Sequence, residues 1–278
     1  MTEKGKMATP IVTDEEITAF EEDGVVCLHQ RFESHWLESL ADGFEKNLAA
    51  PGPNSSQLTP EGNPGGYFDD FLVWHRIQEY RDFIFDSPAA EIAARLMRSN
   101  RCRHFLENAL IKEPGTREVA PWHQDLSYYC VVGSQVCSVW LPLDPVPKSI
   151  CVESVAGSHA WGKLFTPVRF VDHTDYEYQP GVFEQMPDIE ANRDDYRILS
   201  WELEPGDCLV FHMMTIHNAP ATVNYPSRRR AFSTRWLGDD AVYAKRPGKM
   251  FPEIEGLEVR PGEPVDDDAF PLVWSSSS

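Results

Sequence analysis

The first hundred residues carry hydrophobic positions mainly at helical spacing. A Thr-x-x-Glu capping box and a later glycine predict a short helix within 13–24. Apolar side chains every three or four positions predict an amphipathic helix over 36–48. A third helix is expected over 87–96, with proline at a favourable first position. Between the first two helices, the apolar run VVCLH at 25–29 predicts a strand.

From residue 102 onward the pattern changes to short strand-like runs separated by Pro, Gly and Asp. These runs read RHFLENALIKE, VCSVWLPLD, ILSWELE, CLVFHMM and AFSTRWLG. Helices followed by strands favour an antiparallel sandwich or barrel with the helices packed on its outside. The fold class expected from the pattern is therefore mainly β with flanking helices.

We expect one domain over 1–278, with a helical part at about 13–100, a β core at about 102–238 and a C-terminal tail at about 239–278. Two long connections interrupt this order. PGPNSSQLTPEGNPGG at 51–66 is too rich in turn formers for regular structure, and 163–198 is long, polar and aromatic. Each is predicted to be either a lid or a mobile connection.

Composition narrows the function. The formal net charge of −19 repels nucleic acid and anionic membrane surfaces, so neither is an expected partner. No membrane span and no secretion signal are recognisable, so a cytoplasmic location is expected. The six cysteines include no CxxC pair, which predicts free thiols, mostly small core residues. The composition leaves the oligomeric state open.

The stretch PWHQD places His123 and Asp125 two positions apart. In an extended strand both side chains project from the same face, either as a surface pair or as two ligands of a metal. A non-haem ferrous site uses two histidines and one carboxylate and leaves positions open. The second histidine would come from a later strand, and the candidates are His159, His173, His212 and His217.

In EPGDCLVFHMMTIHNAP, His212 and His217 lie on one predicted strand or at its end, and their odd separation allows at most one to face the metal. SRRRAFSTRW follows, and it is expected to pair with the preceding strand as a hairpin. An arginine here could hold the far carboxylate of a dicarboxylate cosubstrate. Alternation places Arg229, Ala231 and Ser233 on one face, and Arg228 and Arg230 on the other.

His123-Gln124-Asp125, GSH at 157–159, Gly206-Asp207 before a histidine strand, and Arg-Arg-Ala at 229–231 together resemble the phytanoyl-CoA dioxygenase family of iron(II)- and 2-oxoglutarate-dependent oxygenases. The resemblance covers roughly residues 13–238. It implies a double-stranded β-helix, the cupin-like jelly roll. It also implies a metal site made of His123, Asp125 and His217, with Arg229 on the cosubstrate and with Asn108 and Trp140 at positions that contact 2-oxoglutarate.

The implied enzyme is a dioxygenase that uses Fe(II), 2-oxoglutarate and O₂ to hydroxylate an unactivated C–H bond of a small metabolite, with succinate and CO₂ as coproducts. Asp125 fills the position that a halide would need, which favours hydroxylation over halogenation. Where the family often has Gly-Ser after the distal histidine, this chain has Asn218-Ala219, so a hydroxyl near the cosubstrate is missing. The alternatives are a zinc-dependent hydrolase on the same triad and a noncatalytic jelly-roll binding protein.

Overall fold

The computed structural model describes residues 10–170, 174–176, 181–246, 251–252, 259–265 and 268–276. Its four α-helices are α1 (Asp14–Asp23), α2 (Ser34–Ala49), α3 (Gln78–Asp86) and α4 (Ala89–Leu96). The predicted capping box at the start of α1 is confirmed: the Thr13 hydroxyl accepts from the Glu16 amide, and the Glu16 carboxylate accepts from the Thr13 amide. Gly24 ends α1 at a φ of 71°, a left-handed conformation that glycine adopts without steric cost.

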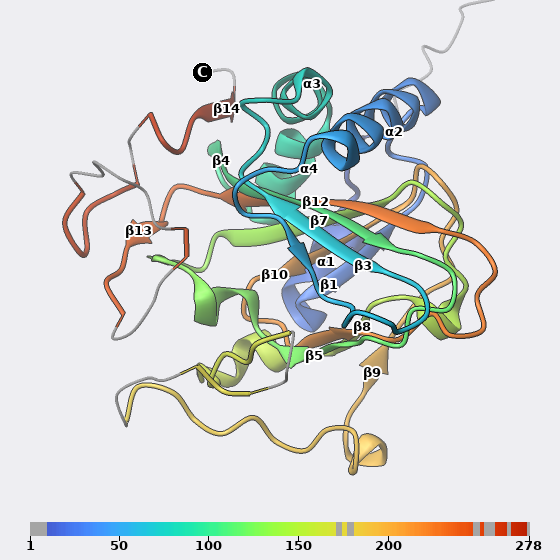
Figure 1. The fold of residues 1–278 in the computed structure, drawn as a ribbon. Coiled ribbons are helices and arrows are strands. Elements are labelled where there is room, and N and C mark those ends of the chain that lie inside the picture. The colour runs from blue at the N-terminus through green and yellow to red at the C-terminus, as the bar shows by residue number, and fades with distance from the viewer. Residues whose placement is uncertain are drawn as a thin grey trace, which may run out of the picture.

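The larger of two main sheets contains eight strands, which pair antiparallel (Figure 1). Their spatial order is β1 (Val25–Leu28), β10 (Cys208–His212), β7 (Val136–Pro142), β12 (Arg229–Leu237), β4 (Arg101–Lys112), β3 (Tyr67–Phe71) and β2 (Ser56–Gln57), with β14 (Leu272–Ser275) also beside β4. Three of these strands precede residue 100, so the N-terminal part supplies sheet as well as helices.

The smaller main sheet has the order β5 (Ala120–His123), β11 (His217–Ala219), β8 (Glu153–Val155) and β9 (Ile198–Leu199). It lies below the large sheet in Figure 1, while α2, α3 and α4 lie above it. A two-stranded ribbon pairs β6 (Val131–Val132) with β13 (Val242–Tyr243). Two facing antiparallel sheets, with the chain passing back and forth between them, form a jelly roll, as expected.

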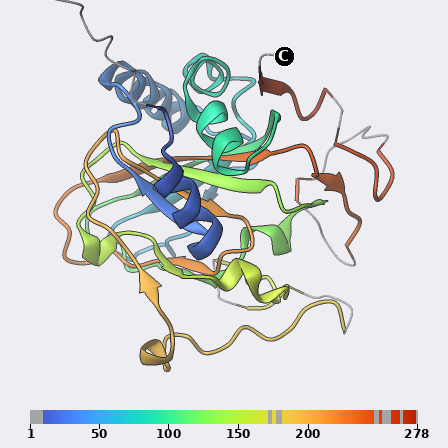
Figure 2. The same cartoon turned by 180° about the vertical axis from the view of Figure 1, so that it is seen from behind.

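Strand alternation gives the large sheet two different faces. On the helix side, Val139 and Leu141 of β7 and Phe232 of β12 belong to the largest apolar cluster, together with residues of all four helices. On the opposite face, Trp140 and Ala231 turn toward the small sheet. Figure 2 views the molecule from behind and shows α1, in dark blue, in front of the large sheet, where it contacts β1 and β10. The helices therefore close one face, and the other face is left to line a cavity.

Most predicted elements are confirmed, but α3 was not predicted. Its apolar residues Tyr80, Phe83 and Ile84 do have helical spacing, and all three are buried. Ser87 and Pro88 separate α3 from α4. The run ILSWELE forms only the two-residue strand β9. Within the described residues, no helix is both long enough and apolar enough to span a bilayer.

Two expectations about the strands are wrong: one places His123 and Asp125 on the same strand, and the other pairs the arginine strand in a hairpin. His123 ends β5, whereas Asp125 begins a 3₁₀ helix over Asp125–Tyr128, so the two do not share a strand. The strand with the arginines, β12, pairs with β4 and β7 in the large sheet and forms no hairpin with β11. The connection at 220–228 instead carries the chain from the small sheet to the large one.

Candidate active site

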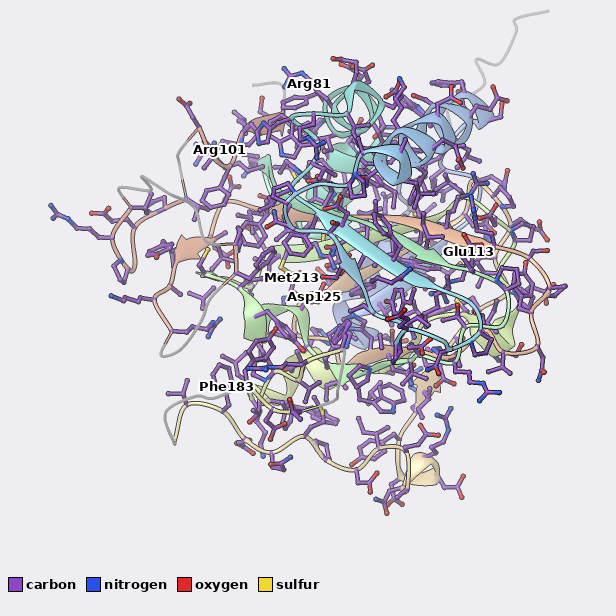
Figure 3. All side chains as sticks on the ribbon, viewed as in Figure 1. Arg81, Arg101, Glu113, Asp125, Phe183 and Met213 are labelled. Atoms are coloured by element: carbon purple, nitrogen blue, oxygen red, sulfur yellow. The ribbon has the colours of Figure 1, made fainter. Side chains whose placement is uncertain are left out.

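His123, Asp125 and His217 lie together between the sheets, although 92 positions separate Asp125 from His217. All three are buried, and one potential ligand atom from each falls within 4.8 Å of the other two. His123 and His217 are directly paired neighbours on β5 and β11. Figure 3 places Asp125 near the middle of the molecule, below the large sheet. The turn after His123 brings the carboxylate beside the two imidazoles.

Hydrogen bonds fix the tautomer of both histidines. His123 Nδ1 donates to the Pro121 carbonyl at 2.7 Å, and His217 Nδ1 donates to the Thr215 carbonyl at 2.9 Å. Because a carbonyl only accepts, Nδ1 carries the proton and Nε2 keeps a free lone pair. Burial and the neighbouring His217 lower the pKa of His123 to about 3, and burial also lowers the pKa of His217. Both imidazoles are neutral at pH 7, the form that binds a metal.

Asp125 is oriented by two other side chains. Its Oδ2 accepts from the Ser138 hydroxyl at 2.7 Å and lies 3.4 Å from Arg235 Nε. Its Oδ1 lies 3.7 Å from His123 Nε2 and 3.9 Å from His217 Nε2. Burial opposes ionisation of this carboxyl, but Arg235 and the two histidines outweigh it and lower the Asp125 pKa to about 2. One oxygen is therefore held by the protein, and the other faces the imidazoles.

Arg229 lies on the wall of the same cavity and is 2% exposed. Its Nη1 donates to the Ile150 carbonyl at 2.8 Å, and its guanidinium lies 5.7 Å from the centre of the Trp140 ring. Its Nε has no hydrogen-bond partner, and among the described residues no carboxylate forms an ion pair with it. Burial lowers the pKa of Arg229. Burying a guanidinium without an acidic partner costs desolvation free energy, and a bound anion would offset this cost. This end of the cavity is therefore suited to an anion.

Two further polar groups lie near Arg229, one on the paired strand and one on the same strand. Lys112 Nζ donates to the backbone carbonyls of Glu118, Ala219 and Pro220, and burial together with the nearby Arg229 lowers the pKa of Lys112 well below its usual range. The Ser233 hydroxyl, on the same strand face as Arg229, is buried and has no partner. The face predicted for Arg229, Ala231 and Ser233 is confirmed. Arg230 instead pairs with Asp144 on the other face.

The cavity has a volume of about 580 Å³. Both long connections contribute to its wall: Ser56 and Leu58 come from 51–66, and Val168, Arg169, Phe170 and Tyr176 come from 163–198. The Tyr128 hydroxyl ties the second connection down, because it donates to the Val168 carbonyl at 2.8 Å and accepts from the Val168 amide at 3.0 Å. Tyr128 and Tyr129 both line the cavity.

The other predicted site residues have clear positions. Trp140 and Asn108 line the cavity, but the Asn108 amide is already bonded to Arg235 and Asp69. Contact of either residue with 2-oxoglutarate stays a prediction. His212 bonds the Ser134 carbonyl, and His159 bonds the Glu21 carbonyl, so both are engaged away from the triad. His173 lies outside the described residues.

Sequence reasoning missed Arg235, Ser138 and Asp69. Arg235 continues the alternation of Arg229, Ala231 and Ser233, so the pattern carried a signal for it. Ser138 contacts Asp125 from a different strand, and no local pattern links them. All six cysteines are free, as expected.

Comparisons with known proteins identify the family and the fold of the chain. The sequence profile of the family described as phytanoyl-CoA dioxygenase (PhyH) matches residues 20–231. A 1-deoxypentalenic acid 11-beta-hydroxylase from Streptomyces exfoliatus is 24% identical over 82% of this chain and 82% of its own length. A probable phytanoyl-CoA dioxygenase from Caenorhabditis elegans is 27% identical over 43% of this chain and 36% of its own length.

Solved structures share the fold at low sequence identity. The non-heme alpha ketoglutarate dependent carbocyclase SnoK from nogalamycin biosynthesis superposes with a TM-score of 0.73 at 21% identity, covering 95% of this chain and 97% of that one. EctD from S. alaskensis, solved with 2-oxoglutarate and 5-hydroxyectoine, gives a TM-score of 0.69 at 17% identity, covering 92% of this chain and 86% of that one.

The profile match includes all four strands of the small sheet, the clustered His123, Asp125 and His217, and Arg229. The resemblance read from the sequence is confirmed. The chain belongs to the phytanoyl-CoA dioxygenase family and is an iron(II)- and 2-oxoglutarate-dependent dioxygenase.

Proposed function

We propose that this dioxygenase hydroxylates an unactivated C–H bond of a small-molecule metabolite, with succinate and CO₂ as coproducts. His123, Asp125 and His217 would hold Fe(II), and Arg229 would bind the distal carboxylate of 2-oxoglutarate. One observation carries the proposal: the buried Arg229, which has no acidic partner among the described residues, lines the same cavity as the buried triad.

The donor set fits a ferrous ion with open positions. Two neutral imidazoles with free Nε2 atoms and one carboxylate would supply the donors of a two-histidine, one-carboxylate site. Bonds from Nδ1 to backbone carbonyls are the usual way to orient metal-binding histidines. Since Asp125 supplies the third protein ligand, no position is left for a halide, which favours hydroxylation over halogenation.

The cosubstrate end fits a dicarboxylate. The free Arg229 Nε and the unpartnered Ser233 hydroxyl both suit an anion buried at this wall. We infer that Ser233 supplies the hydroxyl that is missing after His217, where the chain has Ala219 in place of the family's serine. Asn218 itself donates to Glu153.

When bound, iron with 2-oxoglutarate and O₂ supplies the oxidising chemistry, in which the keto acid loses CO₂ to become succinate and one oxygen atom enters the C–H bond. The chain's own residues bind, orient and exclude water. Apolar and aromatic side chains such as Phe71, Phe170 and Phe251 surround the substrate end of the cavity, which suits a largely apolar metabolite. A cytoplasmic location remains our expectation.

The relative from Streptomyces exfoliatus is described as a hydroxylase and SnoK as a carbocyclase, so product analysis must distinguish hydroxylation from ring formation. A zinc hydrolase would use the triad but would leave Arg229 without a role. A noncatalytic binding protein would need neither O₂ nor the cosubstrate.

The test begins with the purified protein under anaerobic conditions. Adding Fe(II) and 2-oxoglutarate should produce a weak visible charge-transfer band, which both alternatives predict to be absent. With O₂ and fractionated metabolite pools, one compound should gain an oxygen atom as succinate forms. The His123→Ala and Asp125→Ala variants serve as controls. Turnover supported by Zn²⁺ without oxygen, or the absence of the band, would refute the proposal.

A further inference from the structure

One carboxylate in the cavity has no role in holding the metal or the cosubstrate. Asp69 lies at the middle of β3, where strand alternation turns Tyr67, Asp69 and Phe71 toward the cavity. The next residue, Asp70, points the other way and accepts from the Gly52 amide. Asp69 is thus the single acidic side chain that this strand presents to the substrate space.

The Asp69 carboxylate is only half satisfied. Its Oδ1 accepts from Asn108 Nδ2 at 2.8 Å, and no hydrogen bond reaches its Oδ2 from the described residues. No cation in the described part of the chain forms an ion pair with it, although Arg235 lies close enough to favour its charge. Burial raises the Asp69 pKa to about 6. An ionised oxygen that faces a cavity without a partner is stabilised when a bound molecule donates a hydrogen bond to it.

A chain of contacts fixes Asp69 relative to the metal ligands. Arg235 Nη1 donates to Asn108 Oδ1 at 2.5 Å, and because arginine only donates, the Asn108 amide group must point its Nδ2 at Asp69. Arg235 also approaches Asp125. A group bound to Asp69 Oδ2 would therefore sit at a set position relative to the triad.

The charges in the cavity favour a neutral donor. Its lining includes three arginines, Arg169, Arg229 and Arg235, and two aspartates, Asp69 and Asp125. Fe(II) and doubly ionised 2-oxoglutarate add charges that cancel. An ammonium group would enter a site that already holds a cationic excess, and a carboxylate would meet Asp69 directly, whereas a hydroxyl adds no charge.

The walls around Asp69 are aromatic. Phe71 and Phe251 meet edge to face with ring centres 4.3 Å apart, and Tyr128 and Phe170 do so at 6.3 Å. Such walls bury the apolar part of a substrate away from water. A single polar group among them determines the orientation in which that substrate binds.

Building on the function proposed above, we propose that Asp69 is the substrate-recognition residue of this enzyme: its free carboxylate oxygen accepts a hydrogen bond from a hydroxyl group on a ring-containing, mostly apolar substrate. The rigid contacts through Asn108 and Arg235 then decide which C–H bond of that substrate faces the metal.

The probes for the test are 2-naphthol, its methyl counterpart 2-methylnaphthalene and 2-naphthoic acid. Their binding to the protein loaded with Fe(II) and 2-oxoglutarate is measured anaerobically by equilibrium dialysis. The wild type should bind 2-naphthol roughly tenfold more tightly than 2-methylnaphthalene, the usual effect of one hydrogen bond to a charged acceptor. The ratio should fall toward one in Asp69→Ala and be intermediate in Asp69→Asn.

The matched control is Asp70→Asn, which alters the adjacent carboxylate on the opposite face of β3 and should keep the wild-type ratio. An unchanged ratio in Asp69→Ala, no binding of 2-naphthol to the wild type, or tighter wild-type binding of 2-naphthoic acid would each overturn the inference. The charge-transfer band of the wild type reports separately on the proposed function. If the band forms and the ratio does not depend on Asp69, only the substrate assignment fails.

Discussion

Removing the Ser138 hydroxyl should weaken metal binding without touching a metal ligand. Ser138 is fully buried and donates to Asp125 Oδ2 at 2.7 Å, so Ser138→Ala deletes a hydrogen bond to an ionised acceptor. Such a bond contributes about 1.5–3 kcal/mol. Arg235 would remain on the same oxygen, but only at 3.4 Å. The carboxylate would then be free to rotate, and fixing it on metal binding would cost conformational entropy.

We expect the affinity for Mn²⁺, an air-stable substitute for Fe(II), to fall roughly tenfold, within the range known for residues that orient metal ligands. Electron paramagnetic resonance titration of free Mn²⁺ measures this Kd, and urea unfolding of the metal-free protein should show a loss of about 1.5–3 kcal/mol. Ser154→Ala is the matched control, because Ser154 is equally buried beside His217 but its hydroxyl has no partner. Equal Mn²⁺ affinities for the two variants would refute the orienting role of Ser138.

Three other outcomes are expected. Arg229→Gln should raise the Kd for 2-oxoglutarate by at least about tenfold, because a buried charge-assisted contact is lost. Arg230→Gln is the control on the outer face of β12 and should change this Kd little. Calorimetry on the iron-loaded protein measures both Kd values. Asp69→Asn should raise the free energy of unfolding at pH 8 by about 1–3 kcal/mol, because ionising a carboxyl whose pKa is raised in the folded state costs stability. The gain should vanish below about pH 4, where Asp69 is protonated in both the folded and the unfolded state. An equal gain in urea unfolding at both pH values would contradict this reasoning. Thr13→Ala should cost about 1 kcal/mol in urea unfolding through loss of the α1 cap, and no loss would show that α1 needs no cap.

The sequence by itself determined the local features. Thr13 and Glu16 specified the start of α1, because a capping box involves only neighbouring residues. Alternation along β12 put Arg229 and Ser233 on the inner face, since successive side chains of any strand point to opposite sides. The order of the motifs also identified the family, because that order is a property of the chain itself.

Only the tertiary structure decided which strands pair and which side chains meet. Local spacing allowed either His212 or His217 as the second histidine, and only the family resemblance selected His217. The structure separates the two residues, because the chain turns after β10 and His217 enters the other sheet beside His123. The contact of Ser138 with Asp125 likewise joins separate elements. Periodicity reports which face of an element is buried, whereas partners across a cavity depend on long-range packing that no local pattern encodes.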